Sequence, residues 1–139
     1  MRQALHSLHI HTNGKGLVDI GGEISLWLQH QNISSGLLTI FCRHTSASLL
    51  IQENADPDVQ KDLENFFEAI APEDKRRYIH RVEGADDMPA HIRAALSQTQ
   101  LAVPIASGRM VLGAWQGIYL FEHRRAPHRR EVVLHLLGE

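Results

Sequence analysis

Apolar residues in this chain come mostly in short runs separated by turn-forming or charged residues, and this pattern restricts the fold more than any other feature. In the C-terminal part, such runs cover Leu101–Ile105, Met110–Leu112, Trp115–Phe121 and Glu131–Leu137. Earlier runs cover Met1–Thr12, Leu17–Ile20 and Leu37–Phe41. Runs of this length and spacing are typical of β-strands, and Ser107-Gly108-Arg109 suits a hairpin turn. We therefore expect a strand-rich domain.

Helical patterns fall between these runs. Asp56 can cap a helix that has Pro57 in its first turn, and the apolar stripe that follows predicts a helix over Pro57–Ala69. Glu23–Gln31 has a weaker apolar face, after a break expected at Gly21-Gly22. A third helix should be capped by Asp86 or Asp87. The chain is predicted to be one α+β domain, 1–139, with mostly antiparallel strands and two to three helices.

Composition excludes several classes of protein. The 139 residues match one ordinary domain, and the formal charge of -2 does not favour a nucleic-acid binder. Cys42 is the only cysteine, so an internal disulfide is ruled out. No apolar run approaches the ~20 residues of a membrane span, so a cytoplasmic protein without a membrane partner is expected. The 10 histidines stand out, because histidine is the commonest metal ligand.

Two stretches combine histidines with carboxylates. His44 follows a buried strand and precedes Glu53, which could act as a metal ligand or general base; the simpler alternative is a strand-end histidine beside a capping carboxylate. In the second stretch, Asp87 and Asp86 precede His91, and His80 lies on the approach. The acids could serve only as helix caps, but two acids leave one free to orient His91, bind metal or move protons.

Two further stretches carry polar groups. Gln116 and Glu122 bracket apolar residues on one face of a predicted strand, as opposite ends of a pocket or as the polar rim of a sheet. His123–Arg130 is the longest basic cluster, and it falls where a hairpin loop is expected. The predicted phosphate-binding residues are Arg124, Arg125, Arg129 and Arg130. A solvated charged turn is the alternative, and nucleic acid is an unlikely partner because exposed aromatic residues do not interleave with the charges.

Three motifs together resemble the YjbQ-like family, whose members are described as secondary thiamine-phosphate synthases. They are Arg43-His44-Thr45-Ser46-Ala47 with Gln52–Pro57, Asp86–His91, and Gly113–Tyr119 with Glu122-His123-Arg124. The resemblance implies an α+β fold with a barrel-like or bent mixed sheet, a homotrimer, and a metal-associated pocket. It implies His44, His91 and His80 as metal ligands, and Glu53, Asp87, Gln116 and Glu122 as catalytic or orienting groups.

The predicted function is therefore a metal-associated enzyme that acts on phosphorylated small molecules. The resemblance implies that a hydroxymethylpyrimidine pyrophosphate and a thiazole phosphate are joined to give thiamine phosphate and pyrophosphate. Zinc suits the histidine-rich ligand set, whereas magnesium suits pyrophosphate but prefers oxygen ligands. The alternatives are a zinc-dependent phosphoester hydrolase and a non-catalytic trimer that binds a metal or metabolite.

Overall fold

Two antiparallel sheets form the body of the molecule in the computed structural model, which describes residues 1–139. The five-stranded sheet has the order β1-β8-β3-β5-β6 and the three-stranded sheet the order β2-β7-β4. The strands are β1 (Arg2–Thr12), β2 (Gly16–Asp19), β3 (Gly36–Cys42), β4 (Ala47–Glu53), β5 (Gln100–Ala106), β6 (Arg109–Met110), β7 (Gln116–Glu122) and β8 (His128–Gly138). The sheets curl into a half-barrel, so the predicted α+β class is confirmed, and all strand pairs are antiparallel.

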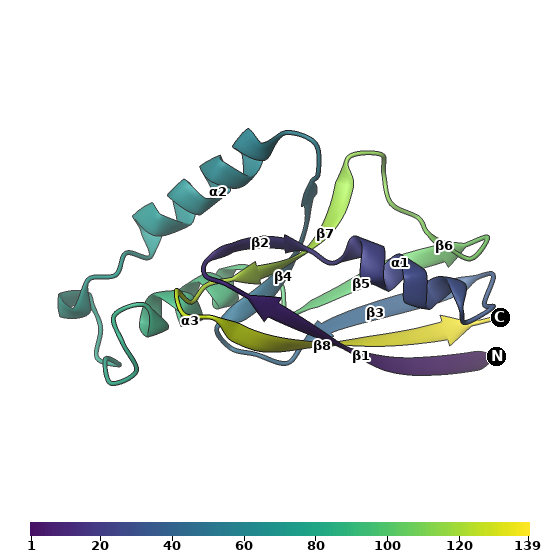
Figure 1. Ribbon diagram of the computed structural model, residues 1–139, viewed down its shortest axis with the longest axis horizontal. Helices are drawn as coiled ribbons and strands as arrows, with labels where there is room; N and C mark the ends of the chain where they lie inside the picture. Colours follow the sequence, from purple (N-terminus) through teal and green to yellow (C-terminus); the bar gives the residue numbers. More distant parts are fainter.

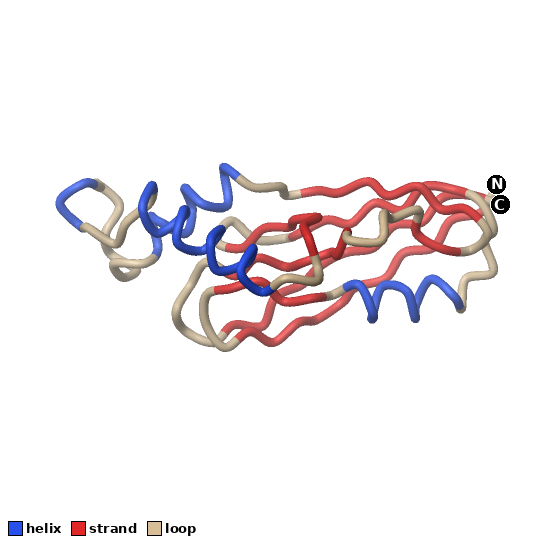
Figure 2. Tube along the Cα trace, turned by 90° about the horizontal axis from the view of Figure 1, so that it is seen from above, coloured by secondary structure: helices blue, strands red, loops and turns tan.

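The core lies between the two sheets. On β3, Leu38 and Ile40 are fully buried, and on β7 Ile118 and Leu120 are fully buried. Helix α1 (Gly21–Gln29) adds Ile24 to the same core. The other two helices are α2 (Pro57–Ile70) and α3 (Asp87–Leu96), with one 3-10 turn at Lys75–Arg77. Figure 1 shows α2 and α3 at the end of the molecule away from both chain termini, and Figure 2 shows the strands along the long axis.

Several sequence expectations hold in detail. Asp56 caps α2 by accepting from the Asp58 amide at 2.9 Å, with Pro57 as the first residue. The hairpin turn between β5 and β6 has positive φ at Ser107 and Gly108. No helix is long and apolar enough to cross a membrane.

Three expectations were wrong. Gly21 and Gly22 form the first turn of α1 instead of breaking the chain before it. Ala47–Glu53 forms β4, although its sequence pattern does not predict a strand; pairing with β7 supplies its hydrogen bonds. The basic stretch His123–Arg130 is not a hairpin loop: residues 123–127 connect β7 to β8, which belong to different sheets, and His128–Arg130 begin β8.

Candidate functional site

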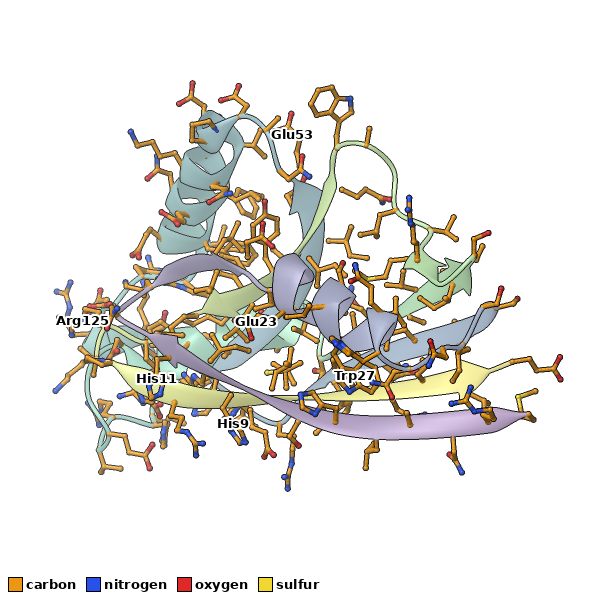
Figure 3. All side chains as sticks on the ribbon, turned by 45° about the vertical axis from the view of Figure 1, so that its right-hand side comes forward. His9, His11, Glu23, Trp27, Glu53 and Arg125 are labelled. Atoms are coloured by element: carbon orange, nitrogen blue, oxygen red, sulfur yellow. The ribbon has the colours of Figure 1, made fainter.

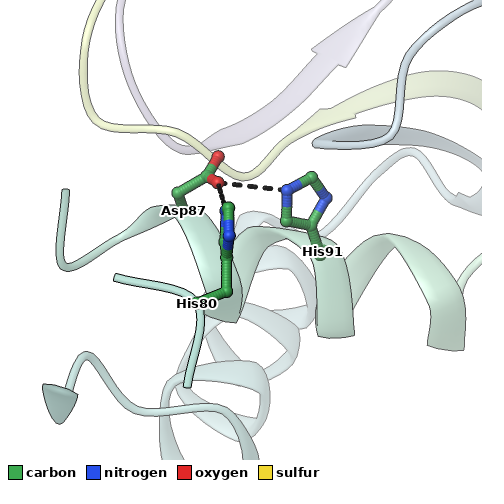
Figure 4. A group of neighbouring side chains, drawn as sticks. All are labelled: His80, Asp87 and His91. Carbon is green, nitrogen blue, oxygen red and sulfur yellow. Dashed lines mark hydrogen bonds and ion pairs between the residues drawn. The ribbon is translucent and has the colours of Figure 1, made fainter. Parts of the chain in front are cut away.

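His80, Asp87 and His91 form the one group of side chains arranged as metal ligands. Their nearest ligand atoms all lie within 4.8 Å of one another. The Oδ2 atom of Asp87 lies 2.7 Å from His80 Nε2 and 3.1 Å from His91 Nε2, so both rings converge on one carboxylate oxygen (Figure 4). Asp87 is buried, whereas the His80 side chain is 40% exposed. The group therefore has an inner carboxylate and an edge open to solvent.

Local structure explains how this group assembles. Asp87 and His91 are four residues apart on α3, a spacing that puts two side chains on the same face of a helix. His80 comes from the irregular segment between the 3-10 turn and α3. His91 Nδ1–H donates to the carbonyl oxygen of Thr45 at 2.9 Å, which ties α3 to the segment between β3 and β4. The three side chains thus depend on both helical spacing and tertiary contacts.

The hydrogen bond from His91 has a consequence for its other nitrogen. A carbonyl oxygen only accepts, so the proton of that bond sits on Nδ1 and leaves the Nε2 atom of a neutral ring with a lone pair. This Nε2 faces an oxygen of Asp87, which also carries lone pairs. The contact becomes favourable when a cation lies there, either a second ring proton or a metal ion.

Arg124 holds the acidic side of this group in place. Its Nη1–H donates to Asp87 Oδ1 at 2.7 Å, its Nε–H donates to Asp86 Oδ2 at 3.0 Å, and its Nη2–H donates to the carbonyl of Glu83 at 3.0 Å. Asp86 also accepts from the Arg125 backbone amide at 2.9 Å. Asp86 occupies the N-cap position of α3 but makes no capping hydrogen bond, so the capping expected of it is wrong. Its carboxylate joins α3 to the β7–β8 connection instead.

These contacts keep the acids ionised. Burial by itself would raise the pKa of Asp87, but the hydrogen bond from His80 and the charges of His91 and Arg124 lower it overall. The pKa of Asp86 is also lowered, because hydrogen bonds from Arg125 and Arg124 outweigh its burial. Asp87 is therefore available as an anionic ligand near neutral pH.

His44 lies outside the group of three. Its Nε2 accepts a hydrogen bond from the Glu131 backbone amide at 2.7 Å, so the lone pair of that nitrogen is already engaged. Burial and then the charge of Arg130 lower the pKa of His44, which keeps the ring neutral. A metal-ligand role for His44 stays a prediction.

Glu122 belongs to a second, fully buried cluster. Its carboxylate forms an ion pair with Arg130 and accepts from the Thr12 hydroxyl at 2.6 Å. Arg130 also donates to Ser46 Oγ at 3.0 Å, so the cluster ties β1, β7 and β8 to the β3–β4 segment. Burial would raise the pKa of Glu122, yet the hydrogen bonds from Arg130 and Thr12 lower it. Glu122 and Arg130 therefore hold each other's side chain in place.

Glu53 and Gln116 lie at the opposite end of β4 and β7 from Glu122. The register pairs Glu53 with Gln116 and Ala47 with Glu122. Six residues of strand separate the two ends by roughly 20 Å. Glu53 Oε2 accepts from the Asp56 amide at 2.9 Å, and Gln116 Oε1 accepts from the Gly113 amide at 2.7 Å. Figure 3 shows Glu53 far from Arg125, whose backbone contacts Asp86.

The four predicted phosphate-binding arginines have different surroundings. Arg124 and Arg130 are bound by carboxylates, as described above. Arg125 is exposed and pairs with Glu73 at 3.3 Å, and Arg129 is exposed on β8. Only the last two therefore present accessible guanidinium groups, and phosphate binding stays a prediction.

Two parts of the site were not anticipated. The clamp of Arg124 on two acids has no local signal, because about forty residues separate them. The Thr45 carbonyl that orients His91 is a backbone group and is invisible to motif reading. The spacing of Asp87 and His91 is the one geometric feature of the site that sequence spacing alone could supply.

The fold and these side chains define a half-barrel protein with a histidine–carboxylate group at one end. The chain belongs to the YjbQ family, because the family model described as "UPF0047 protein YjbQ-like" matches residues 6–139. It is 55% identical over 138 residues to UPF0047 protein sll1880 of Synechocystis sp., covering 99% of this chain and 94% of that protein. It is 36% identical over 135 residues to UPF0047 protein YugU of Bacillus subtilis, covering 96% and 99%.

Solved structures carry the same fold. A conserved hypothetical protein from Thermus thermophilus, TT1486, superimposes with a TM-score of 0.85 at 32% identity, over 95% of this chain and 99% of that chain. An uncharacterized YjbQ/UPF0047 protein from Clostridium acetobutylicum gives a TM-score of 0.84 at 32% identity, over 96% and 99%. None of these names states an activity, so the family is established while the synthase activity has no support from the relatives.

Proposed function

We propose that the protein binds a divalent metal ion, zinc, through His80, Asp87 and His91, and uses it in chemistry on a phosphorylated small molecule. The observation that supports this most is the convergence of two imidazole Nε2 atoms on Asp87 Oδ2, with the His91 proton already held at Nδ1. Two nitrogens and one carboxylate are a ligand set of catalytic zinc sites, which keep a further position open for water or substrate.

A zinc ion in this group would polarise a phosphate oxygen and lower the pKa of a water molecule. The residues of the chain perform the remaining tasks. Thr45 fixes the ring of His91, and Arg124 fixes the carboxylate of Asp87 through Oδ1, so that Oδ2 faces the two imidazole rings. The exposed edge at His80 leaves a way in for a substrate.

Hydrolysis of a phosphate ester fits the nitrogen-rich ligand set more closely than transfer from a pyrophosphate, because pyrophosphate chemistry usually employs magnesium and oxygen ligands. The thiamine-phosphate synthase reaction is the other form of this proposal. We also propose that the working protein is a homotrimer.

The test begins with metal content. Freshly purified wild-type protein should contain stoichiometric zinc, and Asp87→Asn, His80→Ala and His91→Ala should each contain far less. His9→Ala is the matched control, because His9 is exposed on β1 (Figure 3). Thermal unfolding of each variant shows whether it is folded. Equal zinc in wild type and all three site variants would exclude this metal site.

Turnover is measured next, with wild-type protein loaded with zinc and, for comparison, with the His80→Ala variant. We expect release of phosphate from phosphate esters, or formation of thiamine phosphate, by wild type and its loss in the variant. Fully zinc-loaded protein without turnover on either substrate class would instead support a non-catalytic metal-binding trimer.

A further inference from the structure

A cavity of about 130 Å³ lies where α2 and α3 meet the end of β7. Its walls carry the charged or titratable residues Lys15, Glu64, Glu68, Arg93, Glu122 and His123, together with the rings of Phe67 and Phe121. None of His80, Asp87 and His91 lines it, so it is separate from the proposed metal site. Engineered cavities of about 150 Å³ hold benzene, so this space admits a small molecule of a few heavy atoms.

Two residues that line the cavity each have one buried polar atom without a partner: His123 Nδ1 and Arg93 Nε. His123 is 1% exposed and Arg93 is 3% exposed. Their other polar atoms are engaged elsewhere. His123 Nε2 lies 2.9 Å from Ser48 Oγ, and Arg93 Nη2–H donates to the carbonyl of Ala71 at 2.7 Å. Buried polar atoms are nearly always hydrogen-bonded, so two orphans on one small cavity indicate a missing partner.

The chemistry of these atoms specifies that partner. Arg93 Nε–H can only donate. Burial and then the charge of Arg93 lower the pKa of His123 to about 3, so its ring is neutral. When the Ser48 hydroxyl donates to Nε2, the ring proton sits on Nδ1 and His123 is a second donor into the cavity.

The charges around the cavity allow an anion. Lys15 Nζ donates to Glu68 at 2.6 Å and to Glu73 at 2.8 Å, which leaves one of its three N–H groups. Glu68 also pairs with Arg93 at 3.1 Å, so its charge is compensated. The carboxylates of Glu64 and Glu122 also line this cavity, and the charge of Glu122 is compensated by Arg130. Arg93 Nε–H nevertheless lacks an acceptor, as does His123 Nδ1–H in the tautomer in which Ser48 donates to Nε2.

We propose that this cavity binds a small oxyanion, a carboxylate or inorganic phosphate, whose oxygens accept from Arg93 Nε–H and His123 Nδ1–H. The rings of Phe67 and Phe121 meet edge to face, with centroids 5.3 Å apart, and form the apolar part of the wall. Arg93 is on the same helix as Asp87 and His91, but the anion site does not depend on a metal ion or on catalysis. Water molecules that bridge the two orphans are the competing explanation.

Nuclear magnetic resonance of the arginine side chains distinguishes a bound oxyanion from bridging water molecules. The ¹⁵N–¹H signal of Arg93 Nε, assigned by its absence in Arg93→Lys, is followed while sodium acetate or inorganic phosphate is added to wild-type protein at constant ionic strength. The titration is repeated after chelator treatment, so that an anion held by a metal ion is recognised. We expect a saturable shift of the Arg93 Nε and His123 Nδ1 signals with at least one anion, unchanged by the chelator. The anion that saturates the shift at the lower concentration shows whether the cavity prefers a carboxylate or inorganic phosphate.

A matched pair of variants adds an energetic readout. Arg93→Lys keeps the positive charge but loses the Nε donor, so affinity for the anion should fall about tenfold or more. Arg109→Lys makes the same change at an exposed position on β6 and should leave affinity unchanged. If neither anion gives a saturable shift, the cavity holds water only and the proposal is overturned. That result leaves the metal proposal standing, because the zinc measurements are independent of it.

Discussion

At the scale of single residues, two roles are proposed for the guanidinium of Arg124: orienting the carboxylate of Asp87 and binding phosphate. It contacts Asp86, Asp87 and the Glu83 carbonyl with three different N–H groups, a geometry that lysine cannot reproduce. If Arg124 orients a metal-binding carboxylate, Arg124→Lys should weaken zinc affinity by about 10–100-fold, as loss of such outer partners does elsewhere. Competition titration with a zinc indicator measures this. Arg125→Lys is the control, and an unchanged zinc affinity together with a raised KM would favour phosphate binding by Arg124.

The buried ion pair of Glu122 and Arg130 makes a second prediction at this scale. Glu122→Gln removes the charge that compensates Arg130, which is 4% exposed, and should lower the free energy of unfolding by about 3–5 kcal/mol. Chemical denaturation measures the loss. Glu131→Gln breaks the exposed pair with Arg43 and should change stability much less. The double change Glu122→Gln with Arg130→Met should recover part of the loss, and similar effects of both single changes would contradict this account.

Glu122 also makes stability depend on pH. Its pKa is lowered in the folded state from an ordinary value of 4.5, because Arg130 and Thr12 outweigh the effect of burial. A lowered pKa means that the unfolded chain binds the proton first, so this contribution is complete above about pH 4.5 and is lost as pH falls through the folded pKa. Denaturation between neutral and acidic pH should therefore show a shallower fall in Glu122→Gln than in wild type. Parallel curves would show that Glu122 does not contribute.

At the scale of elements, α2 should be the least stable helix. It has no buried residue, and Phe66 is 56% exposed. Its amides should exchange with solvent faster than those of β3 and β8, as measured by hydrogen exchange. Asp56→Ala removes its N-cap and should lower local stability by about 1 kcal/mol. Asp62→Ala, in the middle of the same helix, should not do so; equal effects would exclude capping as the cause.

Elements with local signals were predictable from the sequence, and elements without them were not. Asp56-Pro57 and the apolar stripe placed α2 to within one residue of its end. β4 was missed, because Ala47–Glu53 shows no strict alternation and only long-range pairing with β7 makes it a strand. The sequence predicts a hairpin after β7, because short-range patterns do not show which sheet the next strand joins.

The residues of the candidate site also fall into those with a local sequence signal and those without one. Asp87 and His91 share a helix face at a spacing that the sequence displays. His80 comes from an irregular segment, so its approach to Asp87 depends on the folded chain. The orphan atoms of Arg93 and His123 have no sequence signature at all, because a buried arginine on a helix and a buried histidine after a strand look like ordinary polar residues until the packing around them is known.

At the scale of the whole molecule, the outer face of the five-stranded sheet carries several exposed large apolar side chains. Leu37 pairs with Leu137 across β3 and β8, and both point away from the buried Leu38 and Leu136. Phe41 and Leu5 add to this outer face, at 42% and 71% exposure. Exposed apolar side chains gathered on one face are typical of an interface. The proposed homotrimer would use this face for contacts between its subunits.

We therefore predict a species of three chain masses in sedimentation velocity, and its dissociation when a charge is placed on that face. Leu37→Glu and Leu137→Lys should each shift the protein toward monomer, because assembly would bury an unpaired charge. Leu26→Glu is the control, since Leu26 is 60% exposed on α1 and lies outside the sheet face. Monomeric wild type would contradict the trimer, and dissociation by Leu26→Glu alone would place the interface on α1 instead of the sheet.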